Sequence, residues 1–204
     1  KDTRHMTQST SVGHVTCVLC LVSCDYPMNL IINSSPKDTY SVGVTLAQRL
    51  AQALGGPFDM IRLYDDQGGY FNFTFHDQWI EKVIEAKSLI IPVAMWNFGV
   101  PAALKDFLDK VSKRGRLWDS DQDNRMIGLL KDRPAYIIMT SSYEYEAGHP
   151  GDFVTPYLKT VWASFGVHDA RVFRVGGVDS SRTLSQDDAY LKQKTEEMLR
   201  VFGI

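Results

Sequence analysis

From position 28 to the C-terminus, short apolar runs alternate with longer segments whose apolar residues recur every three or four positions. Short apolar runs predict buried strands, and the longer period predicts amphipathic helices. Their alternation is typical of a parallel sheet that is covered by helices on both faces. The runs predicted as strands are residues 29–33, 59–64, 88–94, 134–140 and 170–177.

The predicted helices follow these strands, at residues 41–54, 76–86, 101–114, 152–165 and 185–202. Ser41 suits the N-cap of the first helix, which Gly55 and Gly56 end. Pro101 stands at the first position of the third helix. Five strands and five helices predict an α/β protein with a doubly wound, five-stranded parallel sheet. Pro92 interrupts the third run, and because proline cannot donate to a ladder we expect regular pairing to end near it.

Residues 1–27 differ from the rest of the chain. A polar segment up to Gly13 is followed by about ten mostly apolar residues, which are too few to span a bilayer. This run resembles a weak signal-peptide core, but no Lys or Arg stands between Met6 and the run. We therefore expect an N-terminal leader or extension over residues 1–27, partly vector-derived because it contains the string RHM, and one folded domain over residues 28–204.

The leader also holds all three cysteines, Cys17, Cys20 and Cys24. Their spacing resembles half of a zinc site, but no fourth ligand follows at a suitable distance, so we expect no metal. A disulfide framework would need pairs spread over the fold, which makes a reducing cytoplasm the expected location. The net charge is −2 and there is no basic run, so we expect neither a nucleic-acid partner nor a membrane span.

In a doubly wound sheet, ligands bind beyond the carboxyl ends of the strands. Three loops leave those ends: the first loop (residues 34–41), the second loop (residues 95–99) and the third loop (residues 141–151). The first loop, SSPKDTYS, opens a helix, whose free N–H groups suit a phosphate monoester together with the serine hydroxyls. It matches neither the P-loop nor the G-x-G-x-x-G pattern, which argues against ATP and a Rossmann dinucleotide. An ordinary helix cap is the alternative interpretation.

The second loop combines flat apolar side chains with an amide. Trp96 and Phe98 offer surface for a planar ring system, and Asn97 can donate to and accept from its polar edge. Gly99 permits close approach of the backbone, and Pro101 begins a helix beside the same place. The alternative is a hydrophobic staple that buries these aromatics under the helix.

The segment AMWNFGVPAALKDFLDKVSKRG resembles the flavin-binding segment of the FMN-dependent NADH azoreductases, within the larger NAD(P)H:quinone reductase family. The resemblance covers roughly residues 28–178 and includes SSPKDTYSVGVTL, GLLKDRPAYIIMTSS and DFVTPYLKTVWASFGVHD. It implies a flavodoxin-like fold with strand order 2-1-3-4-5. It also implies FMN as the cofactor, with NADH or NADPH as the electron donor.

Carried over by position, the resemblance implies FMN contacts from all three loops. The phosphate contacts are Ser35, Ser41, Val42 and Gly43; the ring contacts are Met95, Trp96, Asn97 and Phe98; the third loop contributes Ser141, Ser142, Tyr143 and Glu144. The sequence departs from the family pattern in three places. Gly43 replaces a second hydroxyl residue, Tyr143 and Glu144 replace a Gly-Gly pair, and the proline that usually precedes Met95 stands at position 92. Bulk and negative charge in the third loop are expected to narrow the pocket or to change which acceptor fits.

The resemblance further implies a homodimer that reduces a small aromatic acceptor, a quinone and/or an azo compound, by a ping-pong two-electron mechanism. Tyr143 and His149 are candidate proton donors to the reduced acceptor. Aromatic candidates for pocket or interface walls are Trp118, Trp162, Phe165 and the loop at residues 71–75, and each could equally be a core or surface residue. The alternatives are a non-enzymatic FMN electron carrier and a degenerate flavodoxin-like protein that binds partners instead of flavin.

Overall fold

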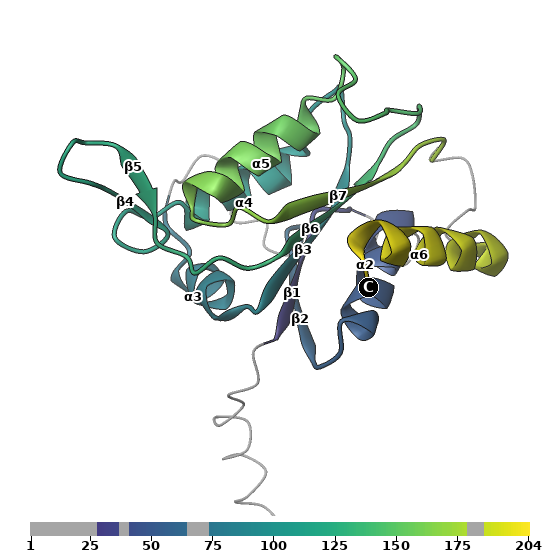
Figure 1. The fold of residues 1–204 in the computed structure, drawn as a ribbon, viewed down its shortest axis with the longest axis horizontal. Coiled ribbons are helices and arrows are strands. Elements are labelled where there is room, and N and C mark those ends of the chain that lie inside the picture. Colours follow the sequence, from purple (N-terminus) through teal and green to yellow (C-terminus); the bar gives the residue numbers. More distant parts are fainter. Residues whose placement is uncertain (1–27, 37–40, 65–73, 179–185) are drawn as a thin grey trace, which may run out of the picture.

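The computed structural model describes residues 28–36, 41–64, 74–178 and 186–204. Its centre is a five-stranded parallel sheet in the order β2-β1-β3-β6-β7, which confirms the predicted order 2-1-3-4-5 (Figure 1). The strands are β1 (Asn29–Asn33), β2 (Phe58–Arg62), β3 (Ser88–Ala94), β6 (Ala135–Thr140) and β7 (Ala170–Val175). The predicted leader and its cysteines lie outside the described residues.

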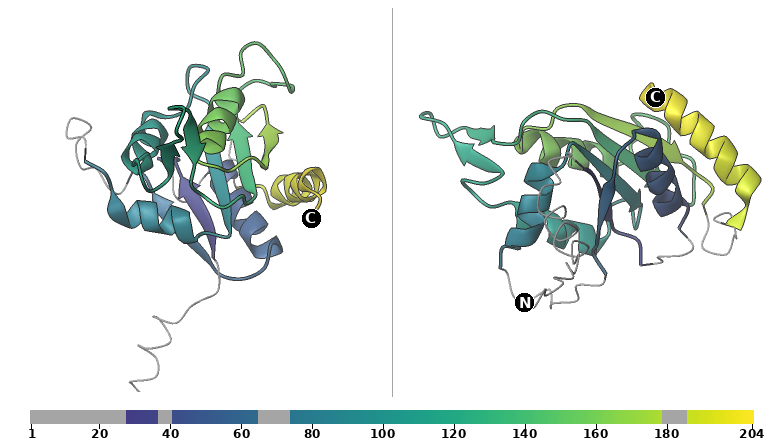
Figure 2. Two further views of the ribbon diagram at one scale, coloured as in Figure 1. Left: turned by 60° about the vertical axis from the view of Figure 1, so that its left-hand side comes forward. Right: turned by 90° about the horizontal axis from the view of Figure 1, so that it is seen from below.

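Helices cover both faces of this sheet, as predicted (Figures 1 and 2). The helices are α2 (Val42–Ala53), α3 (Asp77–Glu85), α4 (Ala102–Val111), α5 (Val154–Ser164) and α6 (Asp188–Phe202). Alternate residues of β1 separate the two layers: Leu30 and Ile32 pack with α3, α4 and α5, whereas Ile31 packs with α2 and α6. Among the described residues, no helix combines the length and the apolar character that crossing a bilayer requires.

Pro92 lies inside β3. The expectation that regular pairing ends near it is confirmed toward β1, whose register with β3 ends at Ile90. It is wrong toward β6, because that pairing continues through Pro92 to Ala94. The Pro92 carbonyl accepts a hydrogen bond from Oγ of Ser34 at 2.9 Å, so this residue directs its backbone polar groups toward β1. The missing N–H therefore costs the β3–β6 ladder nothing.

A short antiparallel hairpin was not predicted. Strands β4 (Trp118–Ser120) and β5 (Met126–Gly128) project from the body of the molecule, at the far left of Figure 1. Strands of three residues in a polar segment give no periodic signal, which is why the sequence did not reveal them. The hairpin is anchored where Gly128 meets Gly166: a Cβ on Gly128 would lie 2.0 Å from the Gly166 nitrogen, so no side chain fits there.

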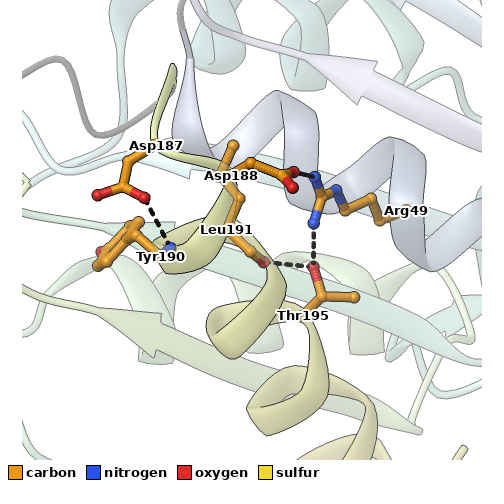
Figure 3. A network of polar contacts seen from close by, with 6 residues as sticks. All are labelled: Arg49, Asp187, Asp188, Tyr190, Leu191 and Thr195. Atoms are coloured by element: carbon orange, nitrogen blue, oxygen red, sulfur yellow. Dashed lines mark hydrogen bonds and ion pairs between the residues drawn. The ribbon is translucent and has the colours of Figure 1, made fainter.

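On the face of the central sheet that α2 and α6 cover, polar contacts join these two helices (Figure 3). Arg49 of α2 pairs with Asp188 at 3.0 Å and donates a hydrogen bond to Oγ1 of Thr195 at 3.4 Å. Oγ1 of Thr195 in turn donates to the Leu191 carbonyl at 2.6 Å. These contacts lie beside the apolar packing that α2 and α6 share, in which Leu50, Leu191 and Met198 are buried.

Candidate functional site

The three loops of the predicted site start from adjacent strands. Strands β1, β3 and β6 are neighbours and parallel, so their carboxyl ends lie at one edge of the sheet. Two hydrogen bonds join the strand ends: Ser34 to the Pro92 carbonyl at 2.9 Å, and the Met95 N–H to the Thr140 carbonyl at 2.8 Å. The structure thus brings the bases of the three loops together.

In the first loop, the described residues form the start of a well-capped helix. Ser41 has an extended backbone, and its Oγ accepts a hydrogen bond from the Val44 N–H at 3.4 Å, as expected of an N-cap. The first helical N–H groups, those of Val42 and Gly43, have no partner within the helix. Ser35 lies beside the end of β1, where its N–H donates to Oδ1 of Asn33 at 2.9 Å. The site therefore offers hydroxyl and amide donors at the positive end of a helix dipole.

Gly43 is buried against the ends of two strands. A Cβ at this position would lie 3.4 Å from Cγ2 of Thr140, 3.5 Å from Cβ of Pro92 and 3.9 Å from Oγ of Ser41. These are ordinary van der Waals distances, so packing does not require glycine here. The lost hydroxyl at this position is a difference in chemistry and not a consequence of crowding.

The second loop is a tight turn that presents its aromatic side chains to solvent. The Trp96 N–H donates to the Gly99 carbonyl and the Gly99 N–H to the Trp96 carbonyl, both at 3.0 Å. Asn97 and Phe98 have φ of 48° and 69°, which is typical of a type I′ turn. Asparagine tolerates this region, but for a bulky residue such as Phe98 the conformation is strained.

Exposure decides between the two interpretations of the second loop. Trp96 is 53% exposed and Phe98 is 55% exposed, so the hydrophobic staple that would bury them is wrong. Met95 is partly buried and packs against the core beneath the turn. Strain together with two exposed aromatic rings at a strand end is typical of a binding site rather than of a packing site.

In the third loop, Tyr143 points outward while the residues around it are held. Ser141 is buried, and its Oγ donates a hydrogen bond to the Tyr143 carbonyl at 2.7 Å. The Ser141 N–H donates to the Val175 carbonyl at 3.1 Å and its carbonyl accepts from the Val178 N–H at 2.9 Å. Tyr143 itself is 75% exposed, and Ser142 is exposed beside it.

Glu144 turns toward α6. Its carboxylate lies on Gly176, where a Cβ would be 2.4 Å from Oε2, so this contact requires glycine. The negative charge of Glu144 acts on two residues of α6, Tyr190 and Lys194. Burial raises the pKa of Tyr190 and Glu144 adds to that rise, against the influence of Lys194. The negative charge that the sequence placed in the third loop is thus directed toward α6.

His149 lies in the far part of the third loop, where it is exposed. Its Nδ1 accepts a hydrogen bond from the Gly151 N–H at 3.0 Å, so in the neutral ring the proton is on Nε2. The ring of Tyr145 meets it edge-on, with centroids 5.0 Å apart. This arrangement leaves Nε2 as the hydrogen-bond donor of His149.

Two of the aromatic wall candidates are core residues. Trp162 and Phe165 are fully or nearly fully buried and pack together edge-on, so their prediction as pocket or interface walls is wrong. Trp118 is half-buried, and its Nε1 donates to the Ser112 carbonyl at 3.2 Å. Phe75 is exposed, and residues 71–73 lie outside the described residues.

A buried ion pair behind the third loop was missed. Asp152 directly follows the loop and is 6% exposed; its Oδ2 lies 3.1 Å from an Nη atom of Arg174 on β7. The same Nη donates to Oγ1 of Thr155 at 3.0 Å, and the Thr155 N–H donates to Oδ1 of Asp152 at 2.9 Å. Burial acts to raise the pKa of Asp152, but the hydrogen bonds from Thr155 and the Arg174 guanidinium outweigh it and lower the pKa. The available signal was the charge of Arg174 in the middle of a run of apolar residues on β7.

Within the described residues, no group of three or more His, Cys, Asp or Glu side chains is arranged to hold a metal ion.

A parallel sheet of this order with its loops gathered at the carboxyl edge defines a flavodoxin-like α/β protein. Residues 28–201 match the family described as having the flavodoxin-like fold. The chain belongs to that family.

Similar proteins share one kind of name. The chain is 33% identical over 105 residues to an FMN-dependent NADH:quinone oxidoreductase from Beijerinckia indica, with 50% of this chain and 52% of the relative covered. It is 38% identical over 120 residues to a protein of the same name from Acidobacterium capsulatum, with 57% and 58% covered. The chain thus spans little more than half the length of these two curated relatives.

Among solved structures, the fold is similar to that of an FMN-dependent NADH-azoreductase from Bacillus anthracis in complex with FMN. The TM-score is 0.67 at 21% sequence identity, covering 86% of this chain and 99% of the other. At this identity the likeness supports the fold.

Proposed function

We propose that this chain is an FMN-dependent NADH oxidoreductase that reduces quinones and/or azo compounds. One observation carries the proposal: the strained turn of the second loop holds Trp96 and Phe98 exposed at the carboxyl edge of the sheet, beside the start of α2. A phosphate at the helix N-terminus and a flat ring against the turn are the two features of FMN that these neighbours suit. The names of the similar proteins point to the same cofactor and donor.

The described residues fit FMN in each part of the site. Phosphate contacts would come from Ser35, from Oγ of Ser41 and from the N–H groups of Val42 and Gly43. Ring contacts would come from Met95, Trp96, Asn97 and Phe98. The third loop would add contacts from the exposed side chains of Ser142 and Tyr143 and from the backbone at Ser141 and Glu144, whose side chains contact the protein itself. These assignments follow from the position of each residue in the three loops and from their donors and exposed rings.

Bound FMN would supply the two-electron redox chemistry between the nicotinamide and the acceptor, in a ping-pong sequence. The protein's part is to bind, orient and protonate. Trp96 and Phe98 would orient flat rings by stacking. Tyr143 and Nε2 of His149 are the candidate donors of a proton to the reduced acceptor, since both are exposed in the third loop.

We also propose a homodimer located in the cytoplasm. The projecting hairpin supports self-association, because Met126, Ile127 and Leu129 expose 41–54% of their surface on one rigidly anchored element. The cytoplasmic location is proposed from the clustering of all three cysteines in one short segment.

The test is a visible spectrum of the purified protein before and after anaerobic addition of NADH. Flavin bands at about 370 and 450 nm that bleach when NADH is added would support a nicotinamide-dependent flavoenzyme. Continued NADH oxidation with a quinone would distinguish an enzyme from an electron carrier. A protein that stays colourless after reconstitution with FMN would overturn the proposal in favour of a degenerate member of the family.

A further inference from the structure

The third loop is attached to β7 and its extension at both ends and in the middle. At its start, Ser141 bonds through its backbone to Val175 and Val178. In the middle, Glu144 lies on Gly176. Just after its end, Asp152 pairs with Arg174. One short stretch of chain, residues 174–178, therefore determines where the third loop lies.

Of these attachments, the contact between Asp152 and Arg174 joins opposite charges. The side chain of Asp152 is 3% exposed and that of Arg174 is 20% exposed, so the pair is shielded from water. One Nη atom contacts both Asp152 and Thr155, while Nε is buried without a hydrogen-bond partner among the described residues. A single cationic group thus provides the connection, and a lysine ammonium can replace it.

We propose that Arg174 is a positioning residue of the candidate site: through Asp152 it holds the third loop in the geometry that receives the flat ring and the acceptor. The inference rests on the proposed function for what the loop receives, and on the ion pair for how the loop is held. Arg174 acts through the loop and does not itself touch the ligand. Its effect is expected on acceptor binding and on the environment of the flavin rather than on the chemistry.

The same strand offers a matched control. Arg171 stands three residues earlier on β7 and also pairs with an aspartate, Asp169, at 2.7 Å. That pair lies at the amino end of the strand, and both of its side chains are 42% exposed. An exposed pair contributes little, and this one is far along the strand from the third loop.

The experiment compares Arg174→Met, Arg174→Lys and Arg171→Met with the unsubstituted protein, each reconstituted with FMN. The readouts are amide hydrogen exchange at residues 142–151, the visible circular dichroism of the bound flavin, and KM for a quinone alongside kcat per bound flavin. Asp152→Asn accompanies them in case Arg174→Met does not fold, because asparagine keeps the acceptor for the Thr155 N–H and removes only the charge.

We expect Arg174→Met to speed exchange in the loop, to change the flavin circular dichroism and to raise KM for the quinone about tenfold, with kcat per flavin within about twofold. Arg174→Lys should restore each readout, Arg171→Met should change none, and Asp152→Asn should act like Arg174→Met. Unchanged exchange and KM in Arg174→Met, or in Asp152→Asn, would overturn the inference. If the unsubstituted protein binds no FMN, the proposed function fails instead, while loop exchange still tests the attachment.

Discussion

The second and third loops follow neighbouring parallel strands, yet they are held differently. The second is held by its backbone, and the third by backbone and side-chain contacts together. The second loop is closed by two backbone hydrogen bonds between Trp96 and Gly99. Within the described part of the chain, no hydrogen bond or ring contact of its aromatic side chains holds it, and more than half of the surface of Trp96 and of Phe98 is exposed. A loop that is held by its backbone leaves its side chains free for a ligand.

The third loop adds side-chain contacts to the backbone hydrogen bonds of Ser141. The Ser141 hydroxyl donates to the Tyr143 carbonyl, Glu144 lies on Gly176, and Asp152 pairs with Arg174 immediately after the loop. Substitution should therefore affect the two loops differently. Changes in the second loop should alter binding without unfolding, whereas changes around the third should alter stability.

The largest effect is expected from Asp152→Ala. This change leaves the partly buried guanidinium of Arg174 without its anionic partner and removes the acceptor for the Thr155 N–H. We expect the free energy of unfolding to fall by about 3 kcal/mol, measured by urea denaturation. Asp169→Ala is the control, because its pair with Arg171 is exposed, and it should cost less than about 1 kcal/mol. Equal losses in the two variants would show that burial does not distinguish the two ion pairs.

The combined change Trp96→Ala and Phe98→Ala tests the opposite behaviour. Two stacking contacts of about 1 kcal/mol each predict that the FMN dissociation constant rises about thirtyfold, measured by quenching of flavin fluorescence. The urea midpoint should remain unchanged because both rings are exposed. Phe58→Ala, at the opposite end of the sheet, should leave FMN binding unaffected. A large loss of stability in the double variant would show that the rings do hold the loop.

Gly176→Ala should disturb the third loop by pushing on Glu144. The added Cβ would approach the carboxylate to 2.4 Å, which predicts a loss of about 1–2 kcal/mol in unfolding free energy. Adding Glu144→Gly should recover only part of that loss, because it removes the carboxylate but leaves the Cα of residue 144, which lies 2.8 Å from the added Cβ. If the double variant were no more stable than Gly176→Ala, the contact between the two residues would not be the cause.

Phe98→Gly should stabilise the protein by about 1 kcal/mol while weakening FMN binding. Its φ of 69° is strained for phenylalanine and free for glycine, and little apolar surface is lost because the ring is exposed. Thermal unfolding with and without FMN measures both effects. A gain in stability without FMN, together with an unchanged affinity for FMN, would mean that Phe98 does not contact the flavin ring.

The smallest effect expected is the change of unfolding free energy with pH near neutrality. The pKa of Asp152 is lowered from its ordinary value of 3.8 because the hydrogen bonds from Thr155 and the ion pair with Arg174 outweigh burial. A carboxyl whose pKa is lower in the folded state contributes stability above its unfolded pKa and loses it as pH falls through the folded pKa. Unfolding free energy should therefore be level near neutrality and decline below about pH 4. Asp152→Asn should reduce that decline; an unchanged slope would show that other carboxyls dominate.

The sequence predicted the sheet and its order well because the central strands are buried throughout, and continuous apolar runs carry that information. The second loop could also be predicted in part, because the residues that form its turn and carry its exposed rings are consecutive in the sequence. The strain at Phe98 was not, because a positive φ depends on how the chain closes from Trp96 to Gly99.

Contacts between distant segments were the part that sequence could not provide. Composition does not say which aromatics face inward, so the sequence offers Trp162 and Phe165 as wall candidates although both are buried. The direction of Glu144 depends on Gly176, and the burial of Asp152 depends on Arg174, more than twenty residues away in each case. Residue type suggested chemistry at the third loop, but only tertiary packing decides where each charge points.

The contacts between α2 and α6 have a consequence for resistance to proteolysis. Helix α2 carries the proposed phosphate end of the candidate site, and it packs against α6, a helix of 15 residues that belongs to none of the three loops. A ligand that binds only the folded state lowers the population of molecules in which its site is open. A phosphate held at the start of α2 should therefore slow proteolytic cleavage within α6, although no residue of α6 would touch it.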